Sequence, residues 1–156
     1  MRFFKIVGIL AGFGVSLAAA QTPQTDVAIG QLQKLHPAAT WKNKSAAVSD
    51  VTCDGQPDTI VFGSENGKVL VAVVPGGNPS KPQIFDFPLA RDKQNGFCAA
   101  PTRINISRLD CDSEEGTLEG CKSVKGCKEF TVDDDDCDAF NFYWDSSQHK
   151  VRWWRE

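Results

Sequence analysis

The spacing of apolar residues along the chain changes once, from a helical period to a strand period. Residues 25–35 carry apolar side chains at the spacing of one helical face, at Ala28, Ile29, Leu32 and Leu35,. Thr25 is the expected N-cap of this helix. Pro37 ends it, because a proline disfavours the helical conformation of the preceding residue. From Asp50 onward the two-residue alternation typical of strands replaces the helical pattern,.

The strand region begins with a predicted hairpin. Residues 59–64 and 69–74 are rich in β-branched side chains, and Asn66-Gly67 between them accepts the positive φ angles of a type I′ turn,. Residues 69–74 are apolar on both faces, which predicts a central position in a sheet. The same criteria predict further strands at residues 83–87, 103–109, 129–132, 139–144 and 150–155,. The expected fold is mainly β: an antiparallel meander, small sandwich or partial propeller-like sheet with one N-terminal helix.

The first twenty residues have the composition of a secretory signal peptide. Arg2 and Lys5 precede an uncharged run, residues 6–20, which ends in three alanines,. This run is shorter than the roughly 18 residues that a membrane-spanning helix needs. We expect cleavage before Gln21, with an uncleaved anchor as the alternative. One domain over residues 21–156 would then be periplasmic or secreted, and the short Gly/Ala-rich leader is typical of bacteria.

All six cysteines follow the expected cleavage site. An even number of cysteines in a small exported domain predicts disulfide bonds. No CxxC pair occurs, which argues against a zinc knuckle and a thioredoxin-type site. The sequence leaves the pairing open, because six cysteines permit 15 connectivities. The residues concerned are Cys53, Cys98, Cys111, Cys121, Cys127 and Cys137.

Charge is distributed unevenly. The net charge of −3 becomes −5 when Arg2 and Lys5 leave with the signal peptide, and residues 110–138 hold 11 of the 20 acidic residues. Nucleic-acid binding needs a basic stripe and is not expected. A basic protein or a cation is the favoured partner, with a merely solvated acidic loop as the alternative. Four adjacent carboxylates, expected to be fully exposed, are candidate partner contacts: Asp133, Asp134, Asp135 and Asp136.

Residues 50–58 have the spacing of a calcium-binding loop. Oxygen-bearing side chains occupy alternate positions, and Gly55 supplies the sharp turn that such loops need,. Three carboxylates predict weak binding, with a dissociation constant of about 10⁻⁴ to 10⁻³ M. A metal-free turn, with aspartates accepting hydrogen bonds from backbone N–H groups, is the alternative. The expected calcium ligands are Asp50, Thr52, Asp54, Gln56 and Asp58.

This pattern, D-x-T-x-D-G-x-x-D followed directly by the apolar strand TIVFG, resembles the calcium loop of FG-GAP and VCBS-type β-propeller repeats. The resemblance covers one copy of a short segment, and it implies a calcium-stabilised β module rather than a complete propeller. The exported β layout and the late aromatic strand FNFYW are also similar to bacterial periplasmic lysozyme-inhibitor and effector-immunity proteins. That resemblance implies binding of a cationic cell-wall hydrolase.

Residues 139–156 contain three of the four tryptophans and the only tyrosine. In a strand, Phe140, Phe142 and Trp144 share one face, which is expected to be core. Tyrosine, tryptophan and arginine dominate binding hot spots. The opposite face is therefore a candidate partner-binding surface, unless the N-terminal helix covers it. It is formed by Asn141, Tyr143, Arg152 and Trp154.

The sequence contains no catalytic motif. His36 and His149 lie outside any nucleophile motif,. The aspartate run offers the opposite of the apolar pocket in which a glycosidase raises the pKa of its acid. We therefore expect a non-enzymatic binding protein of the inhibitor or immunity type. A calcium-stabilised structural module of the cell envelope, with no inhibitory role, is the alternative.

Overall fold

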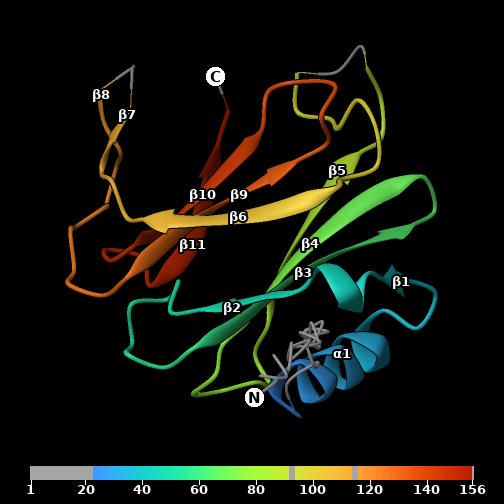
Figure 1. Ribbon diagram of the computed structural model, residues 1–156, viewed down its shortest axis with the longest axis horizontal. Helices are drawn as coiled ribbons and strands as arrows, with labels where there is room; N and C mark the ends of the chain where they lie inside the picture. Colours follow the sequence, from blue (N-terminus) through green and yellow to red (C-terminus); the bar gives the residue numbers. More distant parts are fainter. Residues whose placement is uncertain (1–22, 92–93, 114–115, 156) are drawn as a thin grey trace, which may run out of the picture.

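Two antiparallel sheets pack face to face, and one helix covers the outer side of the first sheet (Figure 1). The computed structural model describes residues 23–91, 94–113 and 116–155, so the expected signal peptide lies outside the described residues. Within those ranges no helix is long and apolar enough to span a bilayer. The predicted fold class is confirmed, and of its alternatives the chain adopts a sandwich.

The first sheet has the order β1–β3–β4–β5, with β2 also paired to β3. The φ angles of Asn66 and Gly67 are 50° and 73°, as the predicted turn requires,. β4 lies between β3 and β5, and all its residues from Val69 to Val74 are buried. The strands are β1 (Thr40–Trp41), β2 (Ala47–Ser49), β3 (Asp58–Glu65), β4 (Lys68–Val74) and β5 (Gln83–Pro88).

The second sheet has the order β11–β10–β9–β6. Its strands are β6 (Arg103–Arg108), β9 (Lys128–Asp133), β10 (Phe140–Asp145) and β11 (Lys150–Trp154). The cysteine-rich segment, which the sequence predicts as loop, contains the small hairpin β7 (Asp112–Ser113) and β8 (Gly116–Thr117). This hairpin projects from the rest of the chain (Figure 1).

The helix α1 (Pro23–Leu35) begins two residues before its predicted start. Proline is suited to the first helical position because its missing N–H has no helical partner there. Thr25 therefore lies inside the first turn and is buried, so its predicted role as N-cap is wrong. Ala28 and Leu32, two residues of the predicted apolar face, are buried against the first sheet, but Leu35 of the same predicted face is 55% exposed. A short 3-10 helix, η1 (Asn43–Ser45), follows β1.

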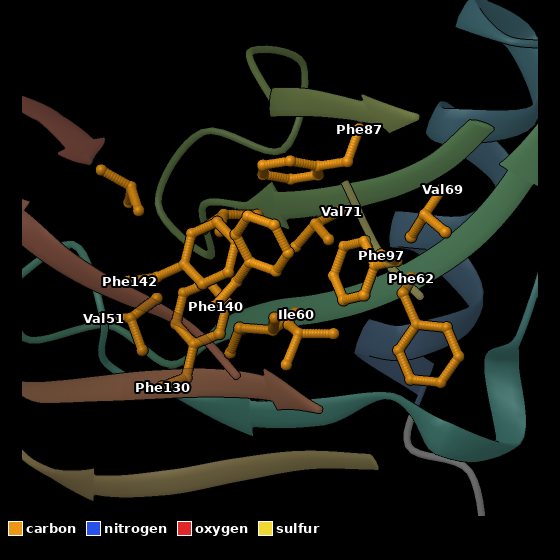
Figure 2. Packing of buried hydrophobic residues seen from close by; sticks show 13 residues of the cluster. Val51, Ile60, Phe62, Val69, Val71, Phe87, Phe97, Phe130, Phe140 and Phe142 are labelled. Carbon is orange, nitrogen blue, oxygen red and sulfur yellow. The ribbon is translucent and has the colours of Figure 1, made fainter. Parts of the chain in front are cut away.

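Aromatic rings fill the space between the two sheets (Figure 2). Phe130 and Phe142 stack in parallel with ring centroids 4.5 Å apart. Phe140 contacts Phe87 across the sandwich and Phe97 from the loop that follows β5, also at 4.5 Å. Aromatic pairs in such arrangements contribute about 0.5–1.5 kcal/mol beyond their buried area. The predicted core face of the aromatic tail is thus confirmed.

All six cysteines are paired. The bonds are Cys53–Cys127, Cys98–Cys137 and Cys111–Cys121. The first joins the loop after β2 to the residue before β9, and the second joins the loops that follow β5 and β9. The third joins two cysteines that are ten positions apart in the sequence, on either side of β7 and β8. The predicted disulfide framework is confirmed.

Candidate functional site

The outer face of the second sheet carries one side chain from each strand in a continuous row. Asn105 on β6 is opposite Thr131 on β9, Thr131 is opposite Asn141 on β10, and Asn141 is opposite Trp154 on β11. Directly opposed residues lie on the same face, so these four side chains form one line across the sheet. We call this line the outer row. All four residues are at least partly exposed.

Trp154 ends the outer row at the sheet edge. It packs against a small cluster built from Leu109, Cys127 and Tyr143 and covered by the Cys111–Cys121 loop. A tryptophan fixed on one side by such packing and open on the other presents a large apolar surface at little cost in conformational entropy. The row therefore combines amide and hydroxyl groups with one rigid aromatic ring.

Tyr143 was predicted to face outward for partner contact, and this is wrong. The Cys111–Cys121 loop, rather than the N-terminal helix, covers this end of the face and leaves Tyr143 only 5% exposed. Its hydroxyl donates a hydrogen bond to the Glu119 carbonyl at 3.1 Å. Burial raises the pKa of Tyr143 despite the opposing charge of Arg152, so the phenol remains a neutral donor,.

Arg152 lies opposite Tyr143 and is anchored within the protein. Its Nη1 lies 2.8 Å from Glu119 Oε2 and 3.5 Å from Asp145 Oδ2. The hydrogen bond to Glu119, more than the other contacts, raises the pKa of Arg152 above its ordinary value. This predicted partner-binding residue thus helps to hold the covering loop.

The aspartate run was predicted to be fully exposed, but Asp134 is only 4% exposed. Its carboxylate accepts hydrogen bonds from four backbone N–H groups, those of Cys98, Ala99, Asp136 and Cys137. Burial acts to raise the pKa of Asp134, but the four bonds together outweigh it and lower the pKa,. The prediction was wrong because N–H donors replace the water that a buried carboxylate needs.

The other three aspartates of the run form ion pairs at the surface. Arg103 contacts both Asp133 and Asp135, and Arg91 contacts Asp136. These arginines neutralise much of the charge that the run was predicted to offer a basic partner. Any partner contact by the run therefore has to compete with existing pairs.

The predicted calcium ligand Asp58 is completely buried at the start of β3. Its Oδ2 accepts hydrogen bonds from the N–H groups of Val51 and Thr52 at 2.8 Å, and its Oδ1 accepts one from Gly76 at 3.0 Å. Burial raises the pKa of Asp58 and outweighs these bonds, which lower it. Asp58 fixes the loop to the first sheet.

The hydrogen bonds of the metal-free alternative are present in the rest of this loop. Asp50 Oδ2 accepts a hydrogen bond from Gly55 N–H at 3.1 Å, and Asp54 Oδ1 accepts one from Gln56 N–H at 2.7 Å. The described residues contain no group of three or more His, Cys, Asp and Glu side chains that could hold a metal ion. However, Asp50 Oδ1 is buried without a hydrogen-bond partner in the described chain. Calcium therefore stays a prediction, centred on Asp50.

A third buried aspartate, Asp145, lies at the end of β10 and was not singled out by the sequence. Its Oδ1 accepts hydrogen bonds from the N–H groups of Ser147 and Gln148 and from the Ser147 hydroxyl. The Ser147 hydroxyl contributes most to lowering the pKa of Asp145. A Cβ at Gly120, whose φ is 72°, would lie 2.0 Å from that oxygen, so this position requires glycine.

Each buried aspartate lies beside a disulfide. Asp58 accepts a hydrogen bond from the backbone N–H of Thr52, the residue before Cys53. Asp134 accepts hydrogen bonds from the N–H groups of Cys98 and Cys137. Asp145 forms an isolated antiparallel β-bridge with Cys121. For Asp134 and Asp145 the sequence does carry a signal of the local turn, an aspartate at a strand end followed by small polar or acidic residues, which is typical of an Asx-type turn,. Asp58 lies at the start of β3 and lacks this pattern. The loops that frame the outer row are therefore held both covalently and by buried carboxylates.

Searches of protein-family models, of curated proteins and of solved structures find no match to this chain. The two resemblances, one to the calcium-loop motif and one to the layout of an exported β domain, thus remain predictions.

Proposed function

We propose that the chain is an exported, non-enzymatic binding protein whose outer row contacts a basic protein partner. The observation that carries the proposal is the row itself. Four partly exposed side chains, including a tryptophan packed on one side, lie in register across four hydrogen-bonded strands. Binding surfaces gain affinity when such groups are held in place before the partner arrives.

The disulfides and the buried aspartates support this role by restricting motion around the row. Asp134 and Cys98–Cys137 hold one end of the second sheet, and Asp145 with Cys111–Cys121 holds the loop beside Trp154. Disulfides of this kind are typical of small exported domains. A surface that needs little ordering loses little entropy on binding.

The charge of the chain favours a basic partner. Residues 110–119 contain five acidic and no basic residues, and Cys111 and Leu118 of this segment pack in the same cluster as Trp154. Such a segment attracts a cationic protein and raises its association rate, an effect that salt screens. A cationic cell-wall hydrolase, blocked by occlusion of its active site, has the required chemistry.

The test is a calorimetric titration of residues 21–156 with a basic lysozyme, together with an assay of cell-wall hydrolysis. We expect binding that weakens as salt is raised, and inhibition at saturation. Thr131→Arg should abolish both, because it places a bulky cation in the middle of the row. Ser64→Arg is the matched control, an exposed hydroxyl residue on β3 of the other sheet, and should bind like the wild type.

Absence of binding at low salt would contradict the proposed partner. An equal loss in the two arginine variants would show that charge alone, rather than the outer row, controls the association.

Asp50 Oδ1, which is buried and has no hydrogen-bond partner among the described residues, favours a second role, in which calcium stabilises the loop of residues 50–58. Calcium prefers oxygen ligands, and an unpaired buried carboxylate oxygen is suited to one. Millimolar calcium should then raise the melting temperature of the domain, and Asp50→Asn should remove most of that rise. A melting temperature that does not respond to calcium would eliminate this role without affecting the binding proposal.

A further inference from the structure

The two sheets meet along two seams that are closed in different ways. At one seam the Cys53–Cys127 disulfide joins the loop after β2 to the start of β9, and Lys128 N–H donates a hydrogen bond to the Asp50 carbonyl at 2.8 Å. At the other seam, between β5 and β11, the Gln83 side chain makes the connection. Its Nε2 donates to the Val151 carbonyl at 2.6 Å, and its Oε1 accepts from Val151 N–H at 2.8 Å.

The Gln83 amide thus pairs with β11 in the way that a peptide group of a neighbouring strand would. Both backbone groups of Val151 point away from β10, because both bind Gln83. In an antiparallel pair this direction repeats every second residue, so the N–H and C=O of Trp153 point to the same open edge. Of the loop and turn hydrogen bonds between described residues, none reaches the Trp153 backbone.

β5 also has a free edge on this side. Leu89 N–H donates a hydrogen bond to the Gly67 carbonyl at 3.2 Å. The backbone N–H and C=O groups of every second residue of β5, counted back from Leu89, therefore point toward β4. By the same alternation the N–H and C=O of Ile84 point away from β4, toward the seam. In the described part of the chain the seam is therefore bordered by two strands whose alternate backbone groups point into it.

A groove with a volume of about 360 Å³ lies at this seam. Phe85 and Trp153, both half-buried, supply its apolar part. Among the described residues that line it, the charged ones are Lys150 and Arg152, although the chain as a whole is acidic. Lys150 is exposed and forms no ion pair with the described residues, whereas Arg152 already contacts Glu119. The groove lining is: Gln83, Phe85, Lys150, Val151, Arg152 and Trp153.

We propose that this β5–β11 groove binds an extended peptide segment with acidic side chains, which pairs with the free edge of β11 at Trp153. Backbone hydrogen bonds would supply affinity, as in other cases of strand addition. Lys150 would select acidic side chains, and Phe85 with Trp153 would receive an apolar one. This surface and the charge of its ligand differ from those of the outer row. The peptide-binding proposal and the proposed function can therefore be tested independently.

A second copy of the chain fits this edge poorly. Pairing of two β11 strands would bring Lys150 and Arg152 of both copies into one groove, and like charges disfavour such an arrangement. Lysine on an edge strand is a common protection against self-association. An acidic partner peptide removes this repulsion, which is why we favour it as the occupant.

The test uses the isotope-labelled domain, residues 21–156, and a pool of seven-residue peptides in which Glu alternates with Val, Ile, Thr or Tyr. We expect peptides from this pool to shift and protect the Trp153 amide. Replacing Glu by Lys in the same peptides should remove binding. N-methylation of alternate peptide nitrogens should also remove it, because a methylated amide donates no hydrogen bond.

Two protein variants sharpen the result. Lys150→Glu, at an exposed position, should weaken binding about tenfold. Gln83→Ala frees the backbone of Val151, so peptide affinity should rise while the melting temperature falls. Lys44→Glu, at an exposed position of η1 away from the groove, should bind peptide like the wild type.

Three outcomes would overturn the proposal: no peptide of the pool perturbs Trp153, the N-methylated peptides bind equally well, or the Lys peptides bind equally well. Protection of Trp153 that depends on protein concentration without any peptide would assign the edge to a second copy instead.

Discussion

Both sheets bury apolar side chains on their inner faces, but their outer faces differ, and α1 lies over the first sheet alone (Figure 1). The outer face of the first sheet is apolar, with Leu70 and Val74 among its residues, and α1 covers it through Ala28 and Leu32. The outer face of the second sheet bears the polar outer row, and a disulfide-closed loop covers only one end of it. An apolar outer face requires a cover from the same chain, whereas a polar face with one packed tryptophan remains available to a partner.

The largest expected effect comes from truncation on the covered face. Leu32→Ala removes a fully buried side chain between α1 and the first sheet and should lower the free energy of unfolding by about 3 kcal/mol,. Asn141→Ala, in the outer row, should change it by less than about 0.5 kcal/mol. Urea denaturation of the two variants measures both values. Similar losses in the two would remove the distinction between the faces.

A smaller effect is expected at the aspartate run, which lies at the end of the uncovered sheet. Asp134→Ala leaves four backbone N–H groups without their acceptor and should destabilise the protein by about 2–3 kcal/mol,. Asp136→Ala removes an exposed pair with Arg91 and should cost less than about 1 kcal/mol,. Equal losses of stability in the two variants would show that the buried hydrogen bonds of Asp134 stabilise this end of the sheet no more than the exposed ion pair of Asp136 does.

Most of the fold was predictable because it depends on local patterns. The turn at Asn66-Gly67, the central position of β4 and the core face of Phe140 and Phe142 follow from φ preferences and two-residue alternation,. The position of α1 was not predictable in the same way. The sequence of an amphipathic helix predicts that one of its faces is apolar, but it does not predict which of the two sheets this face packs against.

The candidate site was predictable only in part. Alternation placed Asn141 and Trp154 on one face, and cross-strand pairing confirms that they are neighbours. Burial of Tyr143 and Asp134 could not be derived, because it depends on loops brought in from distant parts of the chain. Pairing of six cysteines has the same non-local origin.

The smallest expected effect is a difference in pH dependence between two buried aspartates. The pKa of Asp134 is lowered in the folded protein, so its carboxylate stabilises the fold above the unfolded pKa of about 3.9 and ceases to do so as the pH falls below it,. The pKa of Asp58 is raised, so ionisation of this residue lowers stability as the pH rises above about 3.9,.

Unfolding free energies of Asp134→Asn and Asp58→Asn, each subtracted from the wild type between about pH 3 and 6, test this difference. The advantage of the wild type over Asp134→Asn should grow with pH, and its advantage over Asp58→Asn should shrink. If both differences in unfolding free energy changed with pH in the same direction, the pKa values of Asp134 and Asp58 would be shifted in the same direction. That result would contradict the opposite shifts described above.

The central claim is that the uncovered outer face of the second sheet is the binding surface. Amide mapping by nuclear magnetic resonance during titration with a basic lysozyme tests it most directly. We predict that the perturbed amides fall on Asn105, Thr131, Asn141 and Trp154 and their strand neighbours, while those of α1 remain unchanged. Perturbations confined to α1 and the first sheet, or none at any ratio, would contradict the claim.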